Sequence, residues 1–500
     1  MPEGDGHNVV IVAAEAVPFA KTGGLADVVG ALPAALQRLG HAVRVILPAY
    51  RQAWRVSPPP ADTHLTVQVP VAARNVEGRI FEARLPGAEV PVYLIDRPEY
   101  FDRDDLYGRD GADYLDNCER FAFFNRAALE AIARLGLGPD VVHCNDWHAG
   151  LLPVYLAETY RRTPGFAAIG TLLTIHNLAY QGSFARWELP LTGLDARLFN
   201  HHQLEAYGRL NFLKAGMAYA DRINTVSPSY AREIQTPEFG WGLDGLLRHR
   251  GAVLSGIVNG IDPAAWDPRT DSHLIERYDV ATVARGKARC KADLQGRSGL
   301  PLRPEVPLFA QIGRLDSQKG WDLILAIADD LLHGDVQLVV LGVGRFRYHE
   351  QLDDLARRHP GRLRAFLTYS DALAHQIEAG ADIFLMPSLY EPCGLNQLYS
   401  QAYGTIPIVR ATGGLADTVI DAGPRTLADG TATGFAFREA TPRALRGAID
   451  RALALWPDRA AWLRLARTGM RADWSWDRSA REYVRLYDAI RDRHAAPAAV

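Results

Sequence analysis

Cysteine is scarce in this sequence, which contains four cysteines among 500 residues. They lie far apart, without the close spacing that a metal site or a redox motif requires. Scattered cysteines suit a reducing compartment, where thiols stay free. We therefore expect free thiols, no metal centre and a cytoplasmic protein. The cysteines are Cys118, Cys144, Cys290 and Cys393.

Long apolar runs and a strong charge of either sign are also missing. No stretch reaches the length needed to span a membrane, and no signal peptide precedes the first expected strand. The formal net charge is −3, whereas binding to nucleic acid requires a basic face. The sequence thus argues against both a membrane and a nucleic acid as partner.

Hydrophobic residues make up 48% of the chain, enough for large cores and two domains. Short apolar segments alternate with helical patterns almost throughout, which is typical of doubly wound α/β architecture. A turn-rich segment at 253–262 marks the expected domain boundary. We expect one Rossmann-like domain over 1–255, a second over 256–472, and a C-terminal helix at 473–500 that returns to the first. Residues 56–83 predict an antiparallel hairpin outside the main sheet.

Residues 381–419 contain two successive strand-to-helix turns. An apolar run at 383–386 leads through Glu391 to a helical pattern, and a second run at 406–409 leads through a Thr-Gly-Gly turn to another. Both turns would place helix N-termini at one edge of a parallel sheet. Free N–H groups and the positive end of the helix dipole attract an anion there. Glu391 stands at the mouth of the first turn.

The hexapeptide Thr-Gly-Gly-Leu-Ala-Asp occurs at residues 22–27 and again at 412–417. Each copy follows an expected strand and opens an expected helix. One interpretation is that the hexapeptide is simply a favourable strand-to-helix turn. The other is that two helix N-termini face each other across a cleft and hold one polyphosphate ligand. Tandem duplication does not explain the copies, because they lie in the first and a late βα unit.

Arg314 and Lys319 lie on one loop, directly after an expected strand and before a helix. Ligands of open α/β sheets bind at the carboxyl ends of the strands. Arginine offers a planar fork and lysine a point charge, a pair that suits a diphosphate. The alternative is two solvated surface cations, and the neighbouring Gly-Gly turns favour the diphosphate site.

Two strand ends of the first domain carry polar and aromatic side chains. The first group is His143, Asp146, Trp147 and His148, and the second is His176 and Asn177. No spacing among them matches a known metal site. We expect these side chains to contact a sugar instead.

Two further motifs carry little weight. The Asp-Arg-Asp sequence at 102–104 is nominally a metal-nucleotide signature, but it lies in a charged loop where chance matches are common. The Gly-Val-Gly sequence at 342–344 follows a strand, but Arg347 occupies the place of the third glycine. The dinucleotide fingerprint is therefore incomplete, and a nicotinamide dehydrogenase is disfavoured.

Taken together, the motifs resemble those of the bacterial glycogen and plant starch synthases, which are retaining glycosyltransferases. The resemblance runs from residue 9 to about residue 487. It rests on Lys-Thr-Gly-Gly-Leu-Ala-Asp at 21–27, Asp-Trp-His at 146–148, His-Asn at 176–177, Asn-Gly-Ile-Asp at 259–262, Arg314 with Lys319, Glu-Pro-Cys-Gly-Leu at 391–395 and Thr-Gly-Gly at 412–414. The resemblance implies the GT-B fold, in which two Rossmann-like domains face each other across a deep cleft.

The resemblance also implies roles for individual residues. The expected catalytic residues are Glu391 and His176, which would bind the transferred glucose, and Arg314 and Lys319, which would hold the phosphates. The other expected substrate contacts are Lys21, Gly23, Gly24, Asp27, Asp146, Asn177, Asn259, Tyr369, Cys393, Gly394, Leu395, Thr412, Gly413 and Gly414. Of these, Lys21 and Gly24 would contact the nucleotide sugar, and Tyr369 would lie against the base.

The implied reaction transfers glucose, with retention, from ADP-glucose to the non-reducing end of an α-1,4-glucan such as glycogen. Because a nucleoside diphosphate leaves easily, the site needs positive charge for the departing phosphates rather than the strong general acid of glycoside hydrolysis. Glu391 either becomes a covalent nucleophile or stabilises developing charge, and we favour the second role. We expect neither a metal nor a cofactor.

Several alternatives remain open at this point. The donor could be UDP-glucose, and the acceptor could be a disaccharide phosphate or a lipid-linked sugar. A non-catalytic glucan-binding protein is disfavoured, because every expected phosphate ligand is present.

Overall fold

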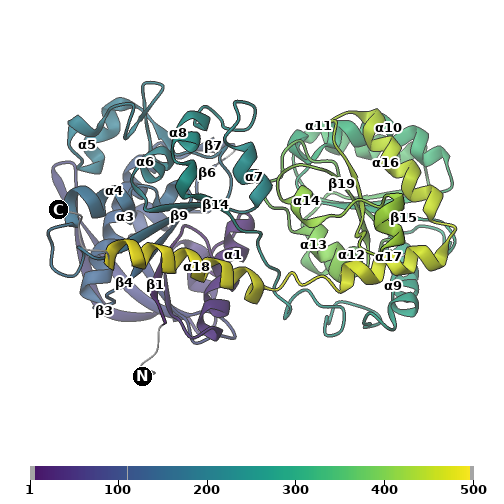
Figure 1. The fold of residues 1–500 in the computed structure, drawn as a ribbon, viewed down its shortest axis with the longest axis horizontal. Helices are drawn as coiled ribbons and strands as arrows, with labels where there is room; N and C mark the ends of the chain where they lie inside the picture. The colour runs from purple at the N-terminus through teal and green to yellow at the C-terminus, as the bar shows by residue number, and fades with distance from the viewer. Residues whose placement is uncertain (1–5, 110, 496–500) are drawn as a thin grey trace. The chain divides into compact units, whose positions relative to one another are not determined.

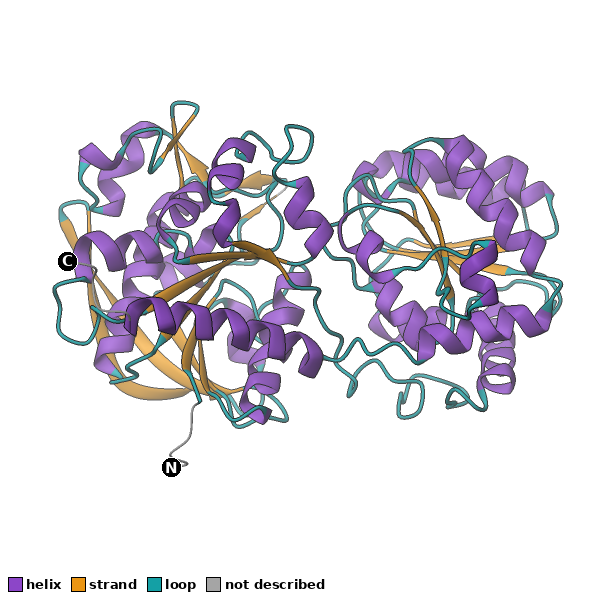
Figure 2. Ribbon diagram, in the orientation of Figure 1, coloured by secondary structure: helices purple, strands orange, loops and turns teal. Residues whose placement is uncertain are grey.

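The computed structural model describes residues 6–109 and 111–495. Its contacts divide into two compact units (Figure 1, Figure 2). Unit 1 comprises the chain up to Gly260 and the segment from Trp476 onward, and unit 2 runs from Ile261 to Ser475. Each unit is built on a largely parallel sheet, so the predicted α/β class is confirmed. Within the described residues, no helix is long and apolar enough to cross a membrane.

Unit 1 contains a nine-stranded sheet in the order β14-β13-β9-β8-β1-β2-β5-β4-β3. Its strands are β14 (Leu254–Gly256), β13 (Arg222–Thr225), β9 (Gly170–Ile175), β8 (Val141–Asn145), β1 (Asn8–Val12), β2 (Ala42–Pro48), β5 (Pro91–Asp96), β4 (Arg74–Arg84) and β3 (Ala61–Val71). Pairing is parallel from β14 to β5. Strand order reverses between β1 and β8, and ligands of open α/β sheets bind at such a switch point.

The hairpin expected outside the main sheet is in fact its edge. β3 and β4 pair antiparallel, and β4 continues antiparallel onto β5. Alternate residues of β3, among them Val67 and Val69, are buried, while their neighbours face solvent. The polarity pattern correctly predicted a half-buried hairpin. The prediction of an excursion was wrong, because residue periodicity does not say which strand a hairpin pairs with.

The helices of unit 1 that cover this sheet include one from the far end of the chain. They are α1 (Gly24–Arg38), α3 (Asn117–Arg134), α6 (Phe212–Tyr219), α7 (Pro228–Glu233), α8 (Asp244–His249) and α18 (Trp476–Ala495). The yellow α18 runs along the sheet in Figure 1. Its Tyr487 is buried, and its hydroxyl lies 2.9 Å from Nδ1 of His143 on β8. The C-terminal helix therefore forms part of the core of unit 1.

Unit 2 contains a six-stranded parallel sheet in the order β17-β16-β15-β18-β19-β20. Its strands are β15 (Leu308–Ile312), β16 (Gln337–Leu341), β17 (Leu363–Phe366), β18 (Ile383–Met386), β19 (Ile406–Arg410) and β20 (Phe435–Phe437). Numbered along the chain, this is the Rossmann order 3-2-1-4-5-6. The switch point lies between β15 and β18, the pair expected to carry the phosphate-binding loops.

Helices flank both faces of the sheet of unit 2, as Figure 2 shows. They are α9 (Val283–Arg297), α10 (Trp321–His333), α11 (Phe346–Arg358), α12 (Asp371–Gly380), α13 (Asn396–Ala402), α14 (Gly413–Thr418), α16 (Pro442–Leu455) and α17 (Arg459–Met470). Apolar residues are buried on both faces, as the near-continuous hydrophobic strands predict.

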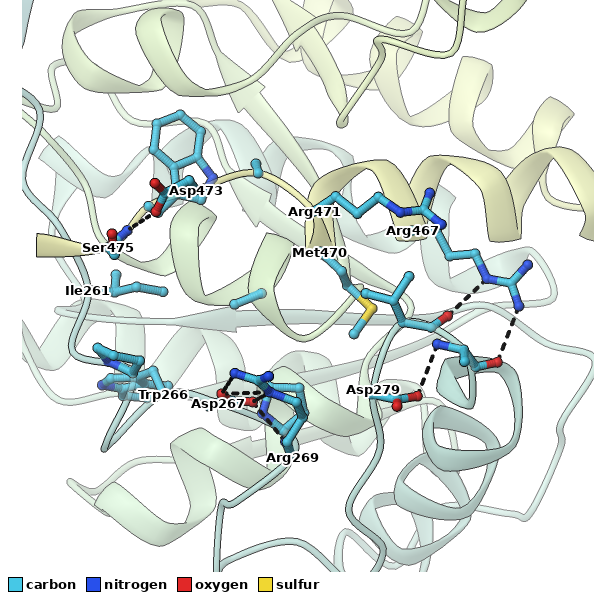
Figure 3. Close-up of a pocket in the computed structure, with 17 residues that line it drawn as sticks. Ile261, Trp266, Asp267, Arg269, Asp279, Arg467, Met470, Arg471, Asp473 and Ser475 are labelled. Carbon is cyan, nitrogen blue, oxygen red and sulfur yellow. Dashed lines mark hydrogen bonds and ion pairs between the residues drawn. The ribbon is translucent and has the colours of Figure 1, made fainter. Parts of the chain in front are cut away.

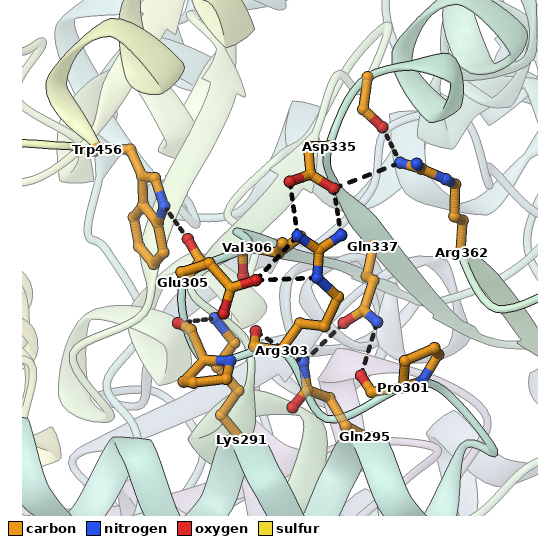
Figure 4. Close-up of polar contacts among 12 residues, drawn as sticks. Lys291, Gln295, Pro301, Arg303, Glu305, Val306, Asp335, Gln337, Arg362 and Trp456 are labelled. Carbon is orange, nitrogen blue, oxygen red and sulfur yellow. Dashed lines mark hydrogen bonds and ion pairs between the residues drawn. The ribbon is translucent and has the colours of Figure 1, made fainter.

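Polar contacts tie the amino ends of the strands of unit 2 to the surrounding helices, and Figure 4 shows the contact between Gln295 and Gln337 among them. Lys291 of α9 lies 2.7 Å from Asp382, which immediately precedes β18. Asp382 in turn accepts a hydrogen bond of 2.9 Å from the N–H of Leu308, the first residue of β15. Gln295 of α9 donates to the side chain of Gln337 at the start of β16. Polar groups at the amino end of the sheet thus have partners within the protein. The loops with the predicted site residues lie at the carboxyl end.

Candidate functional site

The carboxyl ends of β15 and β18 bring together the charged residues predicted for unit 2. Lys319 Nζ lies 2.7 Å from Oε2 of Glu391, and the hydroxyl of Ser388 donates to the same oxygen at 2.9 Å. Only 8% of the Glu391 side chain is exposed, and a buried charge needs a partner inside the protein. Lys319 is that partner. Both contacts engage Oε2, so Oε1 of Glu391 is the oxygen that we expect a ligand to reach.

Arg314 lies on the same loop but is exposed. One terminal nitrogen of its guanidinium donates a hydrogen bond of 2.9 Å to Oε1 of Gln318. Gln318 is itself held in place, because its N–H donates to Asp316 at 3.0 Å. One edge of the Arg314 guanidinium is therefore held by Gln318, while its other N–H donors face solvent. A residue that binds a phosphate needs such free donors.

A cavity of about 120 Å³ lies at this switch point. It is lined by Gln311, Ile312, Gly313, Lys319, Leu385, Met386, Ser388, Glu391, Gly394, Leu395 and Asn396. Oε1 of Gln311 is buried and, among the described residues, has no hydrogen-bond partner. A buried acceptor without a partner is costly unless water or a ligand satisfies it. The cavity therefore offers an acceptor, a cation and a carboxylate to a polar ligand.

The second Thr-Gly-Gly turn packs directly behind this cavity. Gly413 has φ +46°, and a Cβ atom there would lie 2.0 Å from the carbonyl oxygen of Glu391. The N–H of Gly414 donates to that carbonyl at 3.1 Å. The N–H of Leu415 is also engaged, by Thr412. One N–H at the start of α14 thus supports Glu391 and a second closes the turn itself, so fewer N–H groups are free for an anion than the sequence predicted.

The remaining predicted residues of unit 2 fall outside the cavity. Tyr369 lies on the turn before α12 and is 74% exposed. Cys393 is a buried free thiol, and its carbonyl accepts a hydrogen bond of 3.0 Å from Gln397. Cys393 therefore shapes the turn after Glu391, whereas Tyr369 has a free aromatic surface.

The first Thr-Gly-Gly turn, in unit 1, is organised by a carboxylate that the sequence analysis missed. Glu15 is 3% exposed and accepts hydrogen bonds from the N–H and hydroxyl of Thr22 and from the N–H of Gly23. The hydroxyl of Tyr107 donates to it as well, at 2.6 Å. The sequence feature that could have revealed Glu15 is a carboxylate just after the first strand. Glu15 fixes the loop before α1 from inside.

Lys21 and Asp27 flank this turn and pair with each other at 2.7 Å. Side-chain exposure is 42% for Lys21 and 29% for Asp27, so the pair lies at the surface. Exposed pairs contribute little to stability and exchange partners readily. Lys21 is thus accessible to an anionic ligand, with Asp27 as its present counter-ion.

Asp146 and His176 meet at the carboxyl ends of β8 and β9. Asp146 has φ +55°, and its Oδ1 accepts a hydrogen bond of 2.7 Å from the N–H of His176. Nε2 of His176 lies 2.9 Å from Oδ1 of Asn145. The amide nitrogen of Asn145 donates to backbone carbonyls, so its oxygen faces the histidine. His176 therefore carries its proton on Nε2 and leaves Nδ1 as an acceptor.

Burial lowers the pKa of His176 to about 3, so the ring is neutral at neutral pH. Burial, offset in part by hydrogen bonds from the backbone of His176 and Asn177, raises the pKa of Asp146 to about 7. A neutral imidazole with a bare Nδ1 can accept a hydrogen bond from a sugar hydroxyl. It is not an acid at neutral pH.

Other polar residues of unit 1 have structural roles. His143 is 1% exposed and contacts Thr174 and Tyr487, so the expectation that it binds a sugar was wrong. It is fully enclosed by β9 and α18. The side-chain oxygen of Asn177 accepts from the N–H of Ala179 and shapes its turn. Asn259 is 5% exposed, and its Oδ1 has no hydrogen-bond partner in the described parts of the chain.

Two features of the surface lie apart from these residues. Asp102 and Asp104 both pair with Arg51, which accounts for the Asp-Arg-Asp sequence without a metal. A larger cavity of about 740 Å³ in unit 2 lies around Trp266 and Arg471 (Figure 3). None of the predicted site residues lines it. Volume alone therefore does not locate the chemistry.

Comparison with known proteins gives consistent matches over nearly the whole chain. The model of the starch synthase catalytic domain matches residues 8–249, and that of glycosyl transferases group 1 matches residues 296–468. A glycogen synthase of Rhodopirellula baltica is 47% identical over 492 residues, covering 96% of this chain and 97% of the relative. Glycogen synthase 1 of Methylococcus capsulatus is 49% identical and covers 96% of each chain.

Solved structures give the same picture. The catalytic domain of starch synthase IV from Arabidopsis thaliana, bound to ADP and acarbose, superposes with a TM-score of 0.90 at 34% identity. It covers 98% of this chain and 100% of that chain. A sucrose-phosphate synthase from Thermosynechococcus elongatus has a TM-score of 0.59 at 17% identity over 97% of this chain and 99% of its own, a likeness of fold alone.

Proposed function

Because this chain belongs to the family of glycogen and starch synthases and is a glycosyltransferase of the GT-B fold, we propose that it elongates an α-1,4-glucan with glucose from ADP-glucose. Transfer proceeds with retention, to the non-reducing end of glycogen. The starch synthase relative was solved with ADP and acarbose, which supports an adenine nucleotide and a glucan-like acceptor. UDP-glucose is the alternative donor.

The observation that carries the proposal is the Lys319–Glu391 pair at the switch point of unit 2. Donor cleavage releases a diphosphate and leaves positive charge on the sugar. The cations of Lys319 and Arg314 stabilise the departing diphosphate, and the carboxylate of Glu391 stabilises the positive charge on the sugar. Glu391 is held by Lys319 and Ser388 through one oxygen, which supports an electrostatic role rather than that of a covalent nucleophile.

We assign the donor to unit 2 and the acceptor glucan to unit 1, with some unit 1 residues also touching the donor. Nδ1 of His176 accepts a hydrogen bond from a hydroxyl of the transferred glucose. Lys21, Gly23 and Gly24 contact the nucleotide sugar. Tyr369 provides the surface for the base. The exposure of Lys21 and Tyr369 supports these assignments.

Neither a metal nor a cofactor takes part in this proposed reaction. Side-chain cations perform the charge stabilisation that Mg²⁺ provides in many other nucleotide-dependent transferases. Activity should be unchanged after exhaustive chelation. Activity that is lost on chelation and restored by Mg²⁺ or Mn²⁺ would contradict this part of the proposal. The cytoplasmic location is also proposed, and the free thiols of all four cysteines support it.

The direct test measures glucose incorporation into glycogen from ADP-glucose and from UDP-glucose at equal concentrations. The proposal predicts higher kcat/KM with ADP-glucose, and NMR of the product should show new α-1,4 linkages. A preference for UDP-glucose would mean that UDP-glucose, and not ADP-glucose, is the donor. Failure to extend glycogen or maltooligosaccharides with either donor, by a folded protein, would refute the proposed acceptor.

A further inference from the structure

Three side chains with metal-binding atoms converge on unit 2, away from the donor residues. Asp371 and His375 lie one turn apart on α12, and His273 lies on the long segment that precedes α9. One ligand atom from each of the three lies within 4.8 Å of the others. Nε2 of His375 lies 3.9 Å from Oδ2 of Asp371. None of the three lines the cavity that contains Lys319 and Glu391.

The orientation of His375 is fixed by a carboxylate on the opposite side of its ring. Nδ1 of His375 lies 2.8 Å from Oδ2 of Asp271, which is 1% exposed at its side chain. The hydroxyl of Tyr403 donates to the same oxygen at 2.6 Å. An ionised carboxylate only accepts, so Nδ1 carries a proton. Nε2, on the far side, faces His273 and Asp371.

The ring of His375 is also held by stacking. The indole of Trp266 lies parallel to it, with 3.8 Å between ring centroids and an angle of 7° between planes. The phenol of Tyr399 covers the other face of Trp266 at 3.7 Å. Trp266 appears in Figure 3 at the edge of the larger cavity. His375 therefore cannot turn Nε2 toward another partner without breaking this stack.

An ion pair among protein groups explains only one side of this histidine. Its Nδ1 contact with Asp271 is complete, but 3.9 Å from Nε2 to Asp371 exceeds hydrogen-bond distance. Elsewhere in the described residues, no atom forms a hydrogen bond with Nε2. A histidine held by a carboxylate at one nitrogen, with the other nitrogen directed at two further ligands, is the usual arrangement around a bound metal.

We propose that His273, Asp371 and His375 bind a divalent transition metal of the zinc class, with solvent as the fourth ligand. Imidazole and carboxylate ligands suit Zn²⁺, and a tetrahedral site with bonds of about 2.0–2.1 Å places its ligand atoms roughly 3.3 Å apart. To reach this spacing from the present separations of up to 4.8 Å, the side chains of His273 and Asp371 must rotate. Both are exposed and can do so. His375, the buried member, already has its required orientation.

The metal has a structural role in this proposal. His273 belongs to the irregular segment before α9, whereas Asp371 and His375 belong to α12. A common ligand would fasten this segment to the helix. Because the ion binds the folded unit and not the unfolded chain, its binding raises thermal stability. It takes no part in glucose transfer, so the expected activity after chelation is unaffected.

The test uses the untagged full chain and measures binding of Zn²⁺ by isothermal titration, with Co²⁺ as a spectroscopic probe. Wild type should bind one equivalent, and the Co²⁺ form should show the intense visible absorption of a tetrahedral site. His273→Ala and Asp371→Asn alter exposed residues and should fold, yet lose this site. Their melting temperatures should no longer rise on addition of Zn²⁺.

The matched control removes two other exposed histidines, His201 and His202 of unit 1, by His201→Ala and His202→Ala. This double variant should bind Zn²⁺ as wild type does. Asp271→Asn, which alters the group behind His375, should weaken binding about 10- to 100-fold if it folds by circular dichroism. Equal binding by wild type and His273→Ala, or no tetrahedral Co²⁺ spectrum in wild type, would overturn the proposal.

Discussion

The two copies of Thr-Gly-Gly-Leu-Ala-Asp have the same sequence and opposite surroundings. In unit 1, Gly23 is exposed, its φ of −158° is extended backbone, and a Cβ atom there would meet nothing within 4 Å. In unit 2, Gly413 is buried at φ +46°, and a Cβ would lie 2.0 Å from the carbonyl oxygen of Glu391. Both copies open a helix, but α1 begins at the second glycine, Gly24, and α14 at the first, Gly413, so the identical sequence forms two different turns.

The difference between Gly23 and Gly413 distinguishes two reasons why a turn contains glycine. At Gly413 the protein itself demands it, because the backbone bearing Glu391 passes too close for any side chain. At Gly23 nothing in the described structure demands it. Glycine is favoured at the N-cap of α1, and close approach of a ligand to the backbone, as in the proposed contact with the nucleotide sugar, is a second physical reason.

The largest effect is expected for Gly413→Ala. Left-handed φ and the contact with Glu391 together should cost about 3–5 kcal/mol of the free energy of unfolding. Activity should fall as well, because the displaced backbone carries Glu391. Urea denaturation measures the first effect. A loss below about 1 kcal/mol would show that the Glu391 segment yields easily, and that the two turns differ less than the structure indicates.

A second contrast concerns two buried carboxylates: Glu391 contacts the cation of Lys319, whereas Asp146 accepts a hydrogen bond from the backbone N–H of His176. Burial raises the pKa of Asp146 from 3.8 to about 7, so the folded state holds a proton that the unfolded chain releases. This contribution to stability is complete below pH 3.8 and is lost as pH rises through about 7.

Asp146→Asn should therefore flatten the fall of melting temperature between pH 4 and pH 7, because the amide does not titrate. Scanning calorimetry across this range measures the slope. Asp353→Asn, which replaces an exposed acid on α11 with an amide, is the control and should keep the wild-type slope. Equal slopes for wild type and Asp146→Asn would mean that Asp146 is ionised throughout.

The smallest effect on stability is expected for Gly23→Ala. The site is open and its φ is accessible to alanine, so the change should stay within about 1 kcal/mol, the value of an N-cap replacement. The kcat/KM for the nucleotide sugar should nevertheless fall, because a methyl group would separate ligand from backbone. Unchanged kinetics would remove Gly23 from the proposed contacts, and a loss of stability equal to that of Gly413→Ala would abolish the contrast.

Much of the fold follows from patterns that are local in sequence. Threonine followed by proline, at Thr441 and Pro442, is a local start signal for a helix, and the hydroxyl of Thr441 accepts a hydrogen bond from the N–H of Ala444 at the start of α16. The apolar run at 383–386 predicted β18, and the strand expected directly before Arg314 is β15. Their adjacency was not predictable, because strand order depends on which long-range pairing buries most surface.

The candidate site divides in the same way. Lys319 and Glu391 were predicted separately, each from its place at a strand end, and the strand order brings them to 2.7 Å. Glu15 was missed, because its role depends on a turn seven residues later and on Tyr107. His143 was misassigned, because its enclosure by β9 and α18 depends on long-range packing that a strand-end position does not reveal. Strand ends identify candidates, and tertiary contacts decide which of them face a ligand.

The most direct test of the account compares kcat/KM for ADP-glucose in Lys319→Ala with that of wild type. Loss of a charge-assisted phosphate contact should cost about 1.5–3 kcal/mol, roughly ten- to a hundredfold in kcat/KM. Arg358→Ala, which removes an exposed cation paired with Asp329 on the far helices of unit 2, should retain wild-type kinetics. A folded Lys319→Ala variant with wild-type kcat/KM would contradict the account, because the donor phosphates would then bind elsewhere.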